Sequence, residues 1–148
     1  MIDVTLHGRA PKGVDLPMIR RAFQETFRIA RKTERGSVSV AFISDAEMKK
    51  LNTRWRKKNR TTDVLSFAPV SIPGAIHEDV SWGDIFVSFA TVKKEAERRG
   101  IHPVEECLRV IVHGLLHLFG YDHATEAEEF QMFSIQERVV ERVLPSSV

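Results

Sequence analysis

Three histidines lie within eleven residues of this chain, in the segment HGLLHLFGYDH, although the whole sequence contains only six. His113 and His117 are four positions apart, so on a helix their side chains project from one face, with Cβ atoms about 5–6 Å apart. Two imidazoles at that spacing can bind the same metal ion. Gly120 can end such a helix with a positive φ angle, and His123 could then fold back toward the same ion.

A structural role for these histidines is the competing interpretation. One histidine on an apolar helix is usually a hydrogen-bonded core residue, and an HxxxH pair alone is weak evidence for a metal. Two buried imidazoles without a shared partner would, however, each lose about 1–3 kcal/mol to an unpaired nitrogen. The third histidine therefore favours a metal site. Three nitrogen ligands with an open fourth position are typical of a catalytic zinc ion, one per chain, although nickel and copper accept the same ligands.

The neighbours of the histidines narrow the chemistry. Zinc peptidases with an HExxH motif have a glutamate base directly after the first histidine, where this chain has Gly114, so a peptidase is disfavoured. Asp122 is a candidate acceptor for the second nitrogen of a histidine ligand, or it simply shapes the turn. The general base stays open among Asp63, Asp84 and Asp122. The first two stand at expected strand starts, where capping is the commoner role.

The second chemical feature is a basic segment, KKLNTRWRKKNR, with seven basic residues in twelve and no acidic one. Such a run is usually a solvated helix face, but next to a metal site it can hold the phosphates of a nucleic acid. The candidate RNA-binding residues are Lys49, Lys50, Arg54, Arg56, Lys57, Lys58 and Arg60. Trp55 could stack on an unpaired base, but its place at the end of a short helix favours packing in the core.

A small mixed sheet of about four strands is expected to support these features. Alternating or β-branched segments predict strands over residues 2–6, 37–43, 63–67 and 83–89. A long loop with Pro69, Pro73 and Gly74 separates the last two, and a loop of that length is more often functional than idle.

About five helices are expected to pack with the sheet. Helical spacing indicates the first over residues 19–30, and a capping box of Ser44 and Glu47 opens the second, which should bury Met48 and Leu51. The third should run from about residue 91 to Gly100.

The fourth helix, over residues 103–119, is apolar on nearly every side and should be the central, buried helix that bears the metal ligands. Thr125 and Glu128 form a capping box for the last, amphipathic helix. Strands come mostly first and helices last, which predicts an α+β fold.

Composition points to one domain over residues 1–148. The chain is 43% hydrophobic and 28% charged, as in ordinary globular proteins, and no apolar run approaches the ~18 residues needed to cross a bilayer. Cys107 is the single cysteine, expected to be buried and inert, so no intramolecular disulfide can form. These features favour a cytoplasmic protein without a membrane partner.

Charge is unevenly distributed along the chain. Residues 1–102 carry 19 basic and 12 acidic residues, a net charge of +7, whereas residues 103–148 carry 3 and 8, a net charge of −5. The acidic end could face a protein partner, although an acidic surface helix needs none.

Three motifs resemble a known family. HGLLHLFGYDH, TTDVLSF at residues 61–67 and GDIFVS at residues 83–88, in this order and at these spacings, closely resemble the YbeY family of bacterial ribosomal RNA maturation factors. The resemblance extends from about Leu51 to His123. Family members commonly have a Gly-Lys-Asp-like turn where this chain has Lys57, Lys58 and Asn59.

The resemblance implies a zincin-like fold and a single-strand-specific, metal-dependent endoribonuclease. It would act in 16S rRNA 3′-end maturation and ribosome quality control, with zinc held by His113, His117 and His123 and with Arg56 as the functionally important arginine. The implied partners are single-stranded RNA, ribosomal RNA and the small ribosomal subunit, with ribosome-associated proteins as further candidates. In this hypothesis the metal ion polarises a phosphodiester while Arg56 pairs with the phosphate as charge builds.

Two alternatives remain at this point. A zinc-dependent hydrolase of another class, such as a peptidase, would explain the histidines but not the basic segment. A non-catalytic ribosome-assembly factor braced by its metal would need a closed site, which usually has four ligands and often cysteines.

Overall fold

The structure, a computed structural model, describes residues 2–33, 35–69 and 80–144. Its strands and helices are, in chain order, β1 (Ile2–His7), α1 (Leu16–Ile29), β2 (Gly36–Ile43), α2 (Asp45–Arg56), β3 (Val64–Phe67), β4 (Val80–Ser88), α3 (Phe89–Arg99), α4 (Pro103–Leu118) and α5 (Glu126–Val143). The predicted α+β class, with four strands and five helices in the described ranges, is confirmed.

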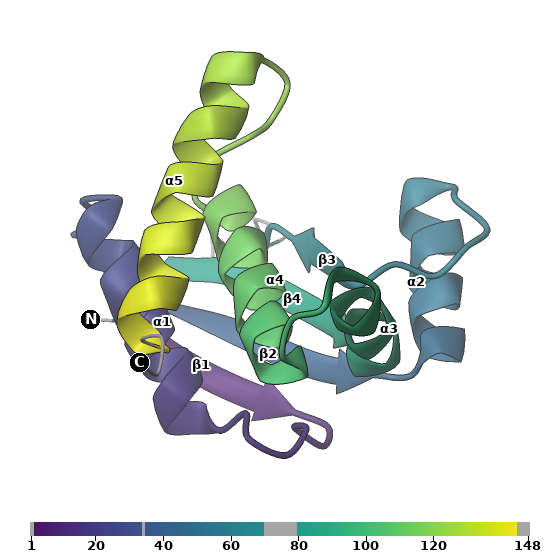
Figure 1. Ribbon diagram of the computed structural model, residues 1–148. Helices are drawn as coiled ribbons and strands as arrows, with labels where there is room; N and C mark the ends of the chain where they lie inside the picture. The colour runs from purple at the N-terminus through teal and green to yellow at the C-terminus, as the bar shows by residue number, and fades with distance from the viewer. Residues whose placement is uncertain (1, 34, 70–79, 145–148) are drawn as a thin grey trace.

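The four strands form one mixed sheet in the order β1-β2-β4-β3 (Figure 1). β1, β2 and β4 are parallel, and the short β3 is an antiparallel edge strand on β4. A bulge lies where Ser37 pairs with Ser81 but Val38 pairs with Gly83. Gly83 has a φ of +124°, and a Cβ atom there would lie 2.2 Å from the carbonyl oxygen of Phe67, so glycine permits the close approach of β3 to β4.

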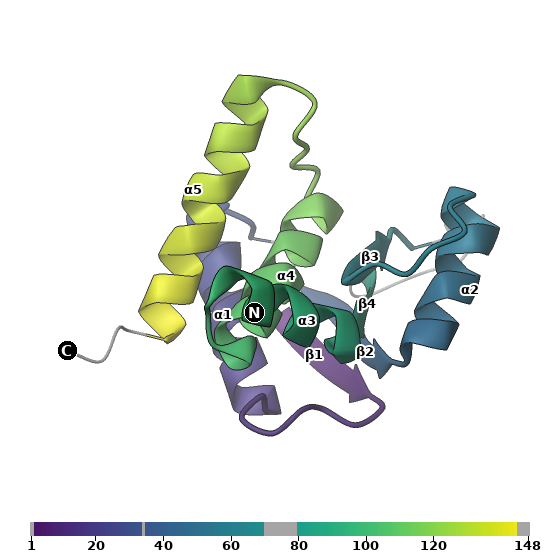
Figure 2. The same ribbon diagram turned by 45° about the vertical axis from the view of Figure 1, so that its right-hand side comes forward.

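Helices α1 and α4 pack on the sheet, and α5 packs over both of them. α3 packs against α4 at one end, and α2 stands beside β3, well apart from α5, as both views show (Figures 1 and 2). α4 therefore lies in the middle, between α5 on one side and the α2–β3 region on the other.

α4 is the central buried helix that its apolar sequence predicts. Leu108, Ile111 and Leu115 are fully buried, and α4 contributes to both hydrophobic clusters of the core. Cys107 is also fully buried, and burial raises the pKa of its thiol to about 12. A thiol in that state is inert, as expected.

Local capping explains where several elements begin. The capping box of Ser44 and Glu47 is present, and the Thr125 hydroxyl accepts a hydrogen bond from the N–H of Glu128. α3 begins at Phe89, two residues before its predicted start, because Ser88 ends β4 and caps the helix by accepting from the N–H of Thr91. The loop prediction at Pro73 and Gly74 lies outside the described residues.

The prediction that Trp55 packs in the core is wrong. Its side chain is 57% exposed, because it lies in the last turn of α2, where the ring of Phe67 on the short β3 meets it edge-on at 6.4 Å. Leu51 is half-buried, and the polar Asn52 is buried in its place. The Asn52 side chain donates to the carbonyl of Arg60 and so holds the segment after α2 in place.

None of the helices in the described part of the chain is both long enough and apolar enough to span a membrane.

Candidate metal centre

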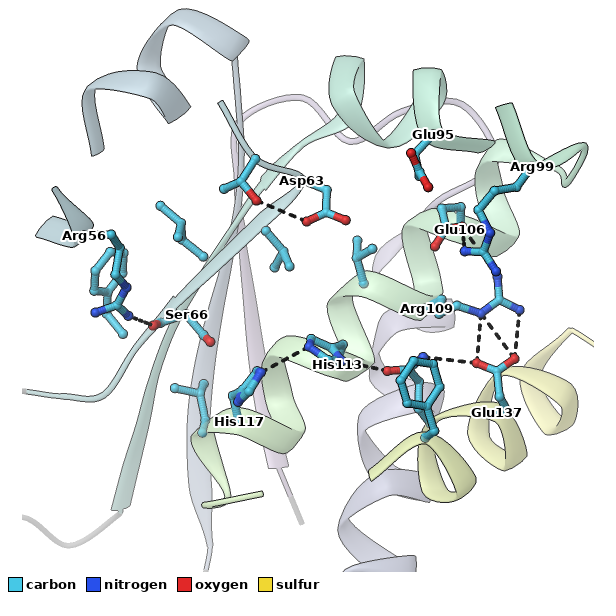
Figure 3. Close-up of a pocket in the computed structure, with 18 of the residues that line it drawn as sticks. Arg56, Asp63, Ser66, Glu95, Arg99, Glu106, Arg109, His113, His117 and Glu137 are labelled. Carbon is cyan, nitrogen blue, oxygen red and sulfur yellow. Dashed lines mark hydrogen bonds and ion pairs between the residues drawn. The ribbon is translucent and has the colours of Figure 1, made fainter. Parts of the chain in front are cut away.

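A cavity of about 1080 Å³ lies over the exposed side of α4. β3 and Arg56 of α2 form one wall, α5 contributes Phe133, Gln136 and Glu137 to the other, and α3 closes one end. His113 and His117 lie on α4 within this cavity, with Arg56 across from them (Figure 3). The cavity therefore brings residues from four helices and the edge strand to one place.

The two helical histidines face each other. Their Nε2 atoms are 3.1 Å apart, and their ring planes meet at 83°. Both side chains are half-buried. The four-residue spacing thus produces the shared face that the sequence predicts.

Hydrogen bonds fix which ring nitrogens carry protons. The Nδ1–H of His113 donates to the side-chain oxygen of Gln136 at 2.8 Å, and the Nδ1–H of His117 donates to the carbonyl of Tyr121 at 3.1 Å. In the neutral imidazoles both Nε2 atoms are then bare acceptors pointing at one another. Two lone pairs at this distance repel unless a cation lies beside them, so the pair is arranged for a metal ion.

The third histidine completes a ligand group. One nitrogen each from His113, His117 and His123 lie within 4.8 Å of one another, so the three residues can hold a metal ion. Tetrahedral zinc with Zn–N bonds of about 2.0–2.1 Å places its ligand nitrogens about 3.3 Å apart, close to the spacing of the first pair. Gly120, with a φ of +100°, turns the chain after α4 and brings His123 to this group.

The surroundings of His117 favour its neutral form, which is the form that binds a metal ion. Burial, and next the neighbouring His113 and His123, lower the pKa of His117, so this imidazole is neutral near pH 7. Proton competition with a metal ion at His117 is correspondingly weak.

Arg56 is held at the cavity wall by β3. Its Nη2–H donates to the carbonyl of Ser66 at 2.8 Å, and its guanidinium carbon lies 4.8 Å from the centre of the Phe67 ring. A guanidinium has five N–H donors, so donors remain for a ligand in the cavity.

The other basic residues of the predicted segment are all exposed. Lys58 and Arg60 line a second hollow of about 380 Å³, which shares Arg56 with the first. Lys57 adopts a left-handed conformation with a φ of 57° at the C-terminal end of α2. This turn leads the chain back from α2 toward β3.

The three candidate carboxylates, Asp63, Asp84 and Asp122, lie in different surroundings and have different partners. Asp63 lines the cavity, where burial raises its pKa, while hydrogen bonds from the backbone N–H groups of Val64 and Asp63 itself, and then the charge of His113, oppose that rise. Asp84 is exposed and accepts a hydrogen bond from the Ser39 hydroxyl on the neighbouring strand. Asp122 accepts from the backbone N–H of His123 at 2.8 Å, the bond of a turn residue. The acceptors for the histidine ring protons are instead Gln136 and Tyr121.

Sequence reasoning missed Gln136, which is 2% exposed. Its amide joins His113 to Glu137, whose carboxylate is held by Arg109. Burial would raise the pKa of Glu137, but hydrogen bonds from Arg109 and Gln136 lower it, so the group is ionised. A signal was available, because Gln136 interrupts the apolar stripe of Met132 and Val139 on the last helix.

Gly114 explains why no glutamate follows His113. A Cβ atom at position 114 would lie 3.0 Å from Cγ2 of Ile85 and 3.4 Å from Cγ2 of Val64. This position therefore faces the sheet rather than the cavity, and a carboxylate there would have no room.

Comparison with known proteins identifies the family. A sequence profile described as Endoribonuclease YbeY matches residues 11–144. The chain belongs to the endoribonuclease YbeY family. A Thermus thermophilus protein named endoribonuclease YbeY is 36% identical over 140 residues, covering 95% of this chain and 99% of its own length. A YbeY protein of Persephonella marina is 38% identical over 107 residues, covering 72% of this chain and 69% of its own.

A solved structure supports the same fold. The solution structure of a Thermotoga maritima protein is 31% identical to this YbeY-family chain, with a TM-score of 0.61 over 97% of this chain and 89% of the other.

Proposed function

We propose that this protein is a metal-dependent endoribonuclease that cuts single-stranded RNA during the maturation of ribosomal RNA, with one zinc ion held by His113, His117 and His123. The observation that carries the proposal is the shared cavity. It combines two facing imidazole nitrogens with the guanidinium of Arg56, which is the pairing of a cation site and an anion site that a phosphodiester substrate needs. Family membership supports the choice of RNA as substrate.

The residues would divide the work as follows. A bound zinc ion would polarise the phosphodiester and help to activate the attacking oxygen. His113, a catalytic residue in this scheme, and His117 present their Nε2 atoms, while Arg56 meets two phosphate oxygens with its planar guanidinium as negative charge builds. The exposed basic residues of α2 and the following turn, namely Lys49, Lys50, Arg54, Lys57, Lys58 and Arg60, hold the RNA backbone without reading its sequence.

The finer assignments rest on the YbeY resemblance. We propose that the substrate is the 3′ end of 16S rRNA, that the protein also serves ribosome quality control, and that it meets its RNA on the small ribosomal subunit in the cytoplasm. The zincin relationship and the extent of the domain, residues 1–148, belong to the same proposal.

The two alternatives explain less. A peptidase of the HExxH type needs a glutamate at position 114. This chain has Gly114 there, close against the side chains of Ile85 and Val64, which leave no room for a glutamate. A structural metal usually has four protein ligands, and the group among the described residues has three, while Cys107 is fully buried in the core.

The test compares cleavage of one RNA as a single strand and as a duplex, with and without a chelator. We expect the single strand to be cut, the duplex to be spared, and cutting to stop with chelator and in His117→Ala, because that change removes a metal ligand. His7→Ala, purified identically, is the matched control, since His7 is exposed on β1 outside the cavity. Equal cleavage by every preparation would reveal a contaminating nuclease and remove the support for this activity.

A further inference from the structure

A series of hydrogen bonds leads from the metal centre to Arg109, a partly buried residue of α4. His113 Nδ1–H donates to Oε1 of Gln136 at 2.8 Å, and the Nε2–H of Gln136 donates to Oε2 of Glu137 at 3.1 Å. Nε and Nη2 of Arg109 then donate to the two carboxylate oxygens of Glu137 at 2.9 and 3.0 Å. Figure 3 shows Arg109 and Glu137 at one end of the cavity, with His113 beside them on α4. Each link has a defined donor and a defined acceptor.

The orientation of the Gln136 amide decides which groups donate and which accept along this series of hydrogen bonds. The two ends of this amide have nearly the same shape, so a half-turn about the last side-chain bond would exchange oxygen and nitrogen at little steric cost. The exchanged amide would present N–H groups to Nδ1 of His113. Nδ1 would then have to accept, the ring proton would move to Nε2, and Nε2 would no longer be a ligand.

Glu137 decides between these two arrangements. An ionised carboxylate has acceptors and no donor, so it attracts the NH₂ end of Gln136 and repels the oxygen. Arg109, whose side chain is 13% exposed, holds that carboxylate in place through its Nε and Nη2 atoms, although the Glu137 side chain itself is 47% exposed. Neighbouring residues on a helix do not usually face each other, so the bond from Gln136 to Glu137 is a specific arrangement.

We infer that Glu137, held by Arg109, is a positioning residue that sets the orientation of the Gln136 amide and so keeps Nε2 of His113 free to bind a metal ion. The inference rests on the proposed metal centre for its function, but the tautomer of His113 is a property of the metal-free protein. The two ideas can therefore be tested separately.

The first experiment is ¹⁵N NMR of the imidazole rings in metal-free protein. Wild type should show His113 protonated at Nδ1 with a bare Nε2. Glu137→Gln should give a mixture of tautomers, since a glutamine at 137 can offer either its oxygen or its NH₂ to Gln136. An unchanged His113 tautomer in Glu137→Gln would overturn the inference, whether or not the wild type binds metal.

The second experiment measures Zn²⁺ affinity by competition with a chromophoric chelator. Glu137→Gln should weaken binding by about 10-fold to 100-fold, as for other partners of metal-ligating histidines. In a Gln136→Glu background the same change should have almost no effect, because a carboxylate at 136 accepts from His113 in either orientation. Equal weakening in both backgrounds would mean a general structural loss and would contradict the inference.

Two further variants keep the result interpretable. Glu141→Gln is the matched control, since Glu141 is exposed one turn further along α5 and should leave both readouts unchanged. Arg109→Lys preserves the charge but loses the two-pronged contact, and it should shift the His113 tautomer in the same direction as Glu137→Gln. If Glu137→Gln does not fold, Arg109→Lys decides the question. A wild-type His113 tautomer in folded Arg109→Lys would then refute the proposed role of Arg109 and Glu137.

Discussion

Asp63 lines the cavity of the metal centre, and its protonation should affect stability. Burial raises its pKa in the folded protein above the ordinary value of about 3.9. A carboxyl group whose pKa is raised by folding favours the folded state while it is protonated. That contribution is fully present below the unfolded pKa and is lost as the pH rises through the folded pKa.

Replacing Asp63 by asparagine should therefore stabilise the metal-free protein at neutral pH more than at acidic pH. Urea unfolding of wild type and Asp63→Asn at a series of pH values measures the difference. It should be smallest near pH 4 and grow as the pH rises. Asp3→Asn, at an exposed position on β1, is the control. A stability difference that is constant or shrinks with rising pH would show that burial of the Asp63 charge is unimportant.

Individual residues mark the limit of what the sequence can predict about the site. Helical periodicity is local, so the shared face of His113 and His117 follows from their spacing. The choice of ring nitrogen does not, because it depends on Gln136, which lies 23 positions away and reaches His113 only after α5 packs on α4. The exposure of Trp55 is beyond local sequence signals for a similar reason, since Trp55 contacts Phe67 of the edge strand β3, a pairing that forms only in the folded chain.

At the scale of elements, the turn after α2 carries backbone strain. Lys57 occupies the left-handed region with a φ of 57°, where a side chain with a Cβ atom is disfavoured by about 1 kcal/mol or more. Its N–H nevertheless bonds to the carbonyl of Asn52, which ends the helix. The cap therefore forms at the expense of a strained residue.

Lys57→Gly should be more stable than Lys57→Ala by about 1 kcal/mol, because glycine adopts this conformation freely. Both variants remove the same charge, so the difference between their free energies of unfolding reports the backbone conformation at position 57. Urea unfolding of the two proteins under one condition provides the measurement. Equal stabilities, or a more stable alanine variant, would show that position 57 is not left-handed in solution.

Most elements were predictable, and their arrangement less so. Capping residues and apolar spacing mark helix and strand positions because these signals lie within a few residues. The order β1-β2-β4-β3 depends on pairing between β2 and β4, which α2 and β3 separate in the chain. The bulge at Gly83, which lets β3 approach, likewise has meaning only once the strands are paired.

At the scale of the whole molecule, the fold places the basic segment of α2 and the acidic start of α5 on opposite sides of α4. The basic residues of α2 stand on one side of α4, and α5, whose first turn contains Glu126, Glu128 and Glu129, stands on the other (Figure 2). The charge imbalance along the sequence is thus carried by two helices on opposite sides of α4, and Arg56 is the basic residue of α2 that lines the cavity. An RNA backbone should be drawn toward the α2 side, where Arg56 meets the cavity.

The central claim is that a metal ion at the histidines and Arg56 act together on RNA. The most direct measurement is the cleavage rate of a single-stranded RNA as Zn²⁺ is added to metal-free wild type and to Arg56→Ala. The wild-type rate should rise until one ion is bound per chain and then level off. Arg56→Ala should bind one ion equally well but cut about 100-fold to 1000-fold more slowly, the loss expected when a donor to developing charge is removed. A wild-type rate independent of Zn²⁺, or an Arg56→Ala variant as fast as wild type, would contradict the account.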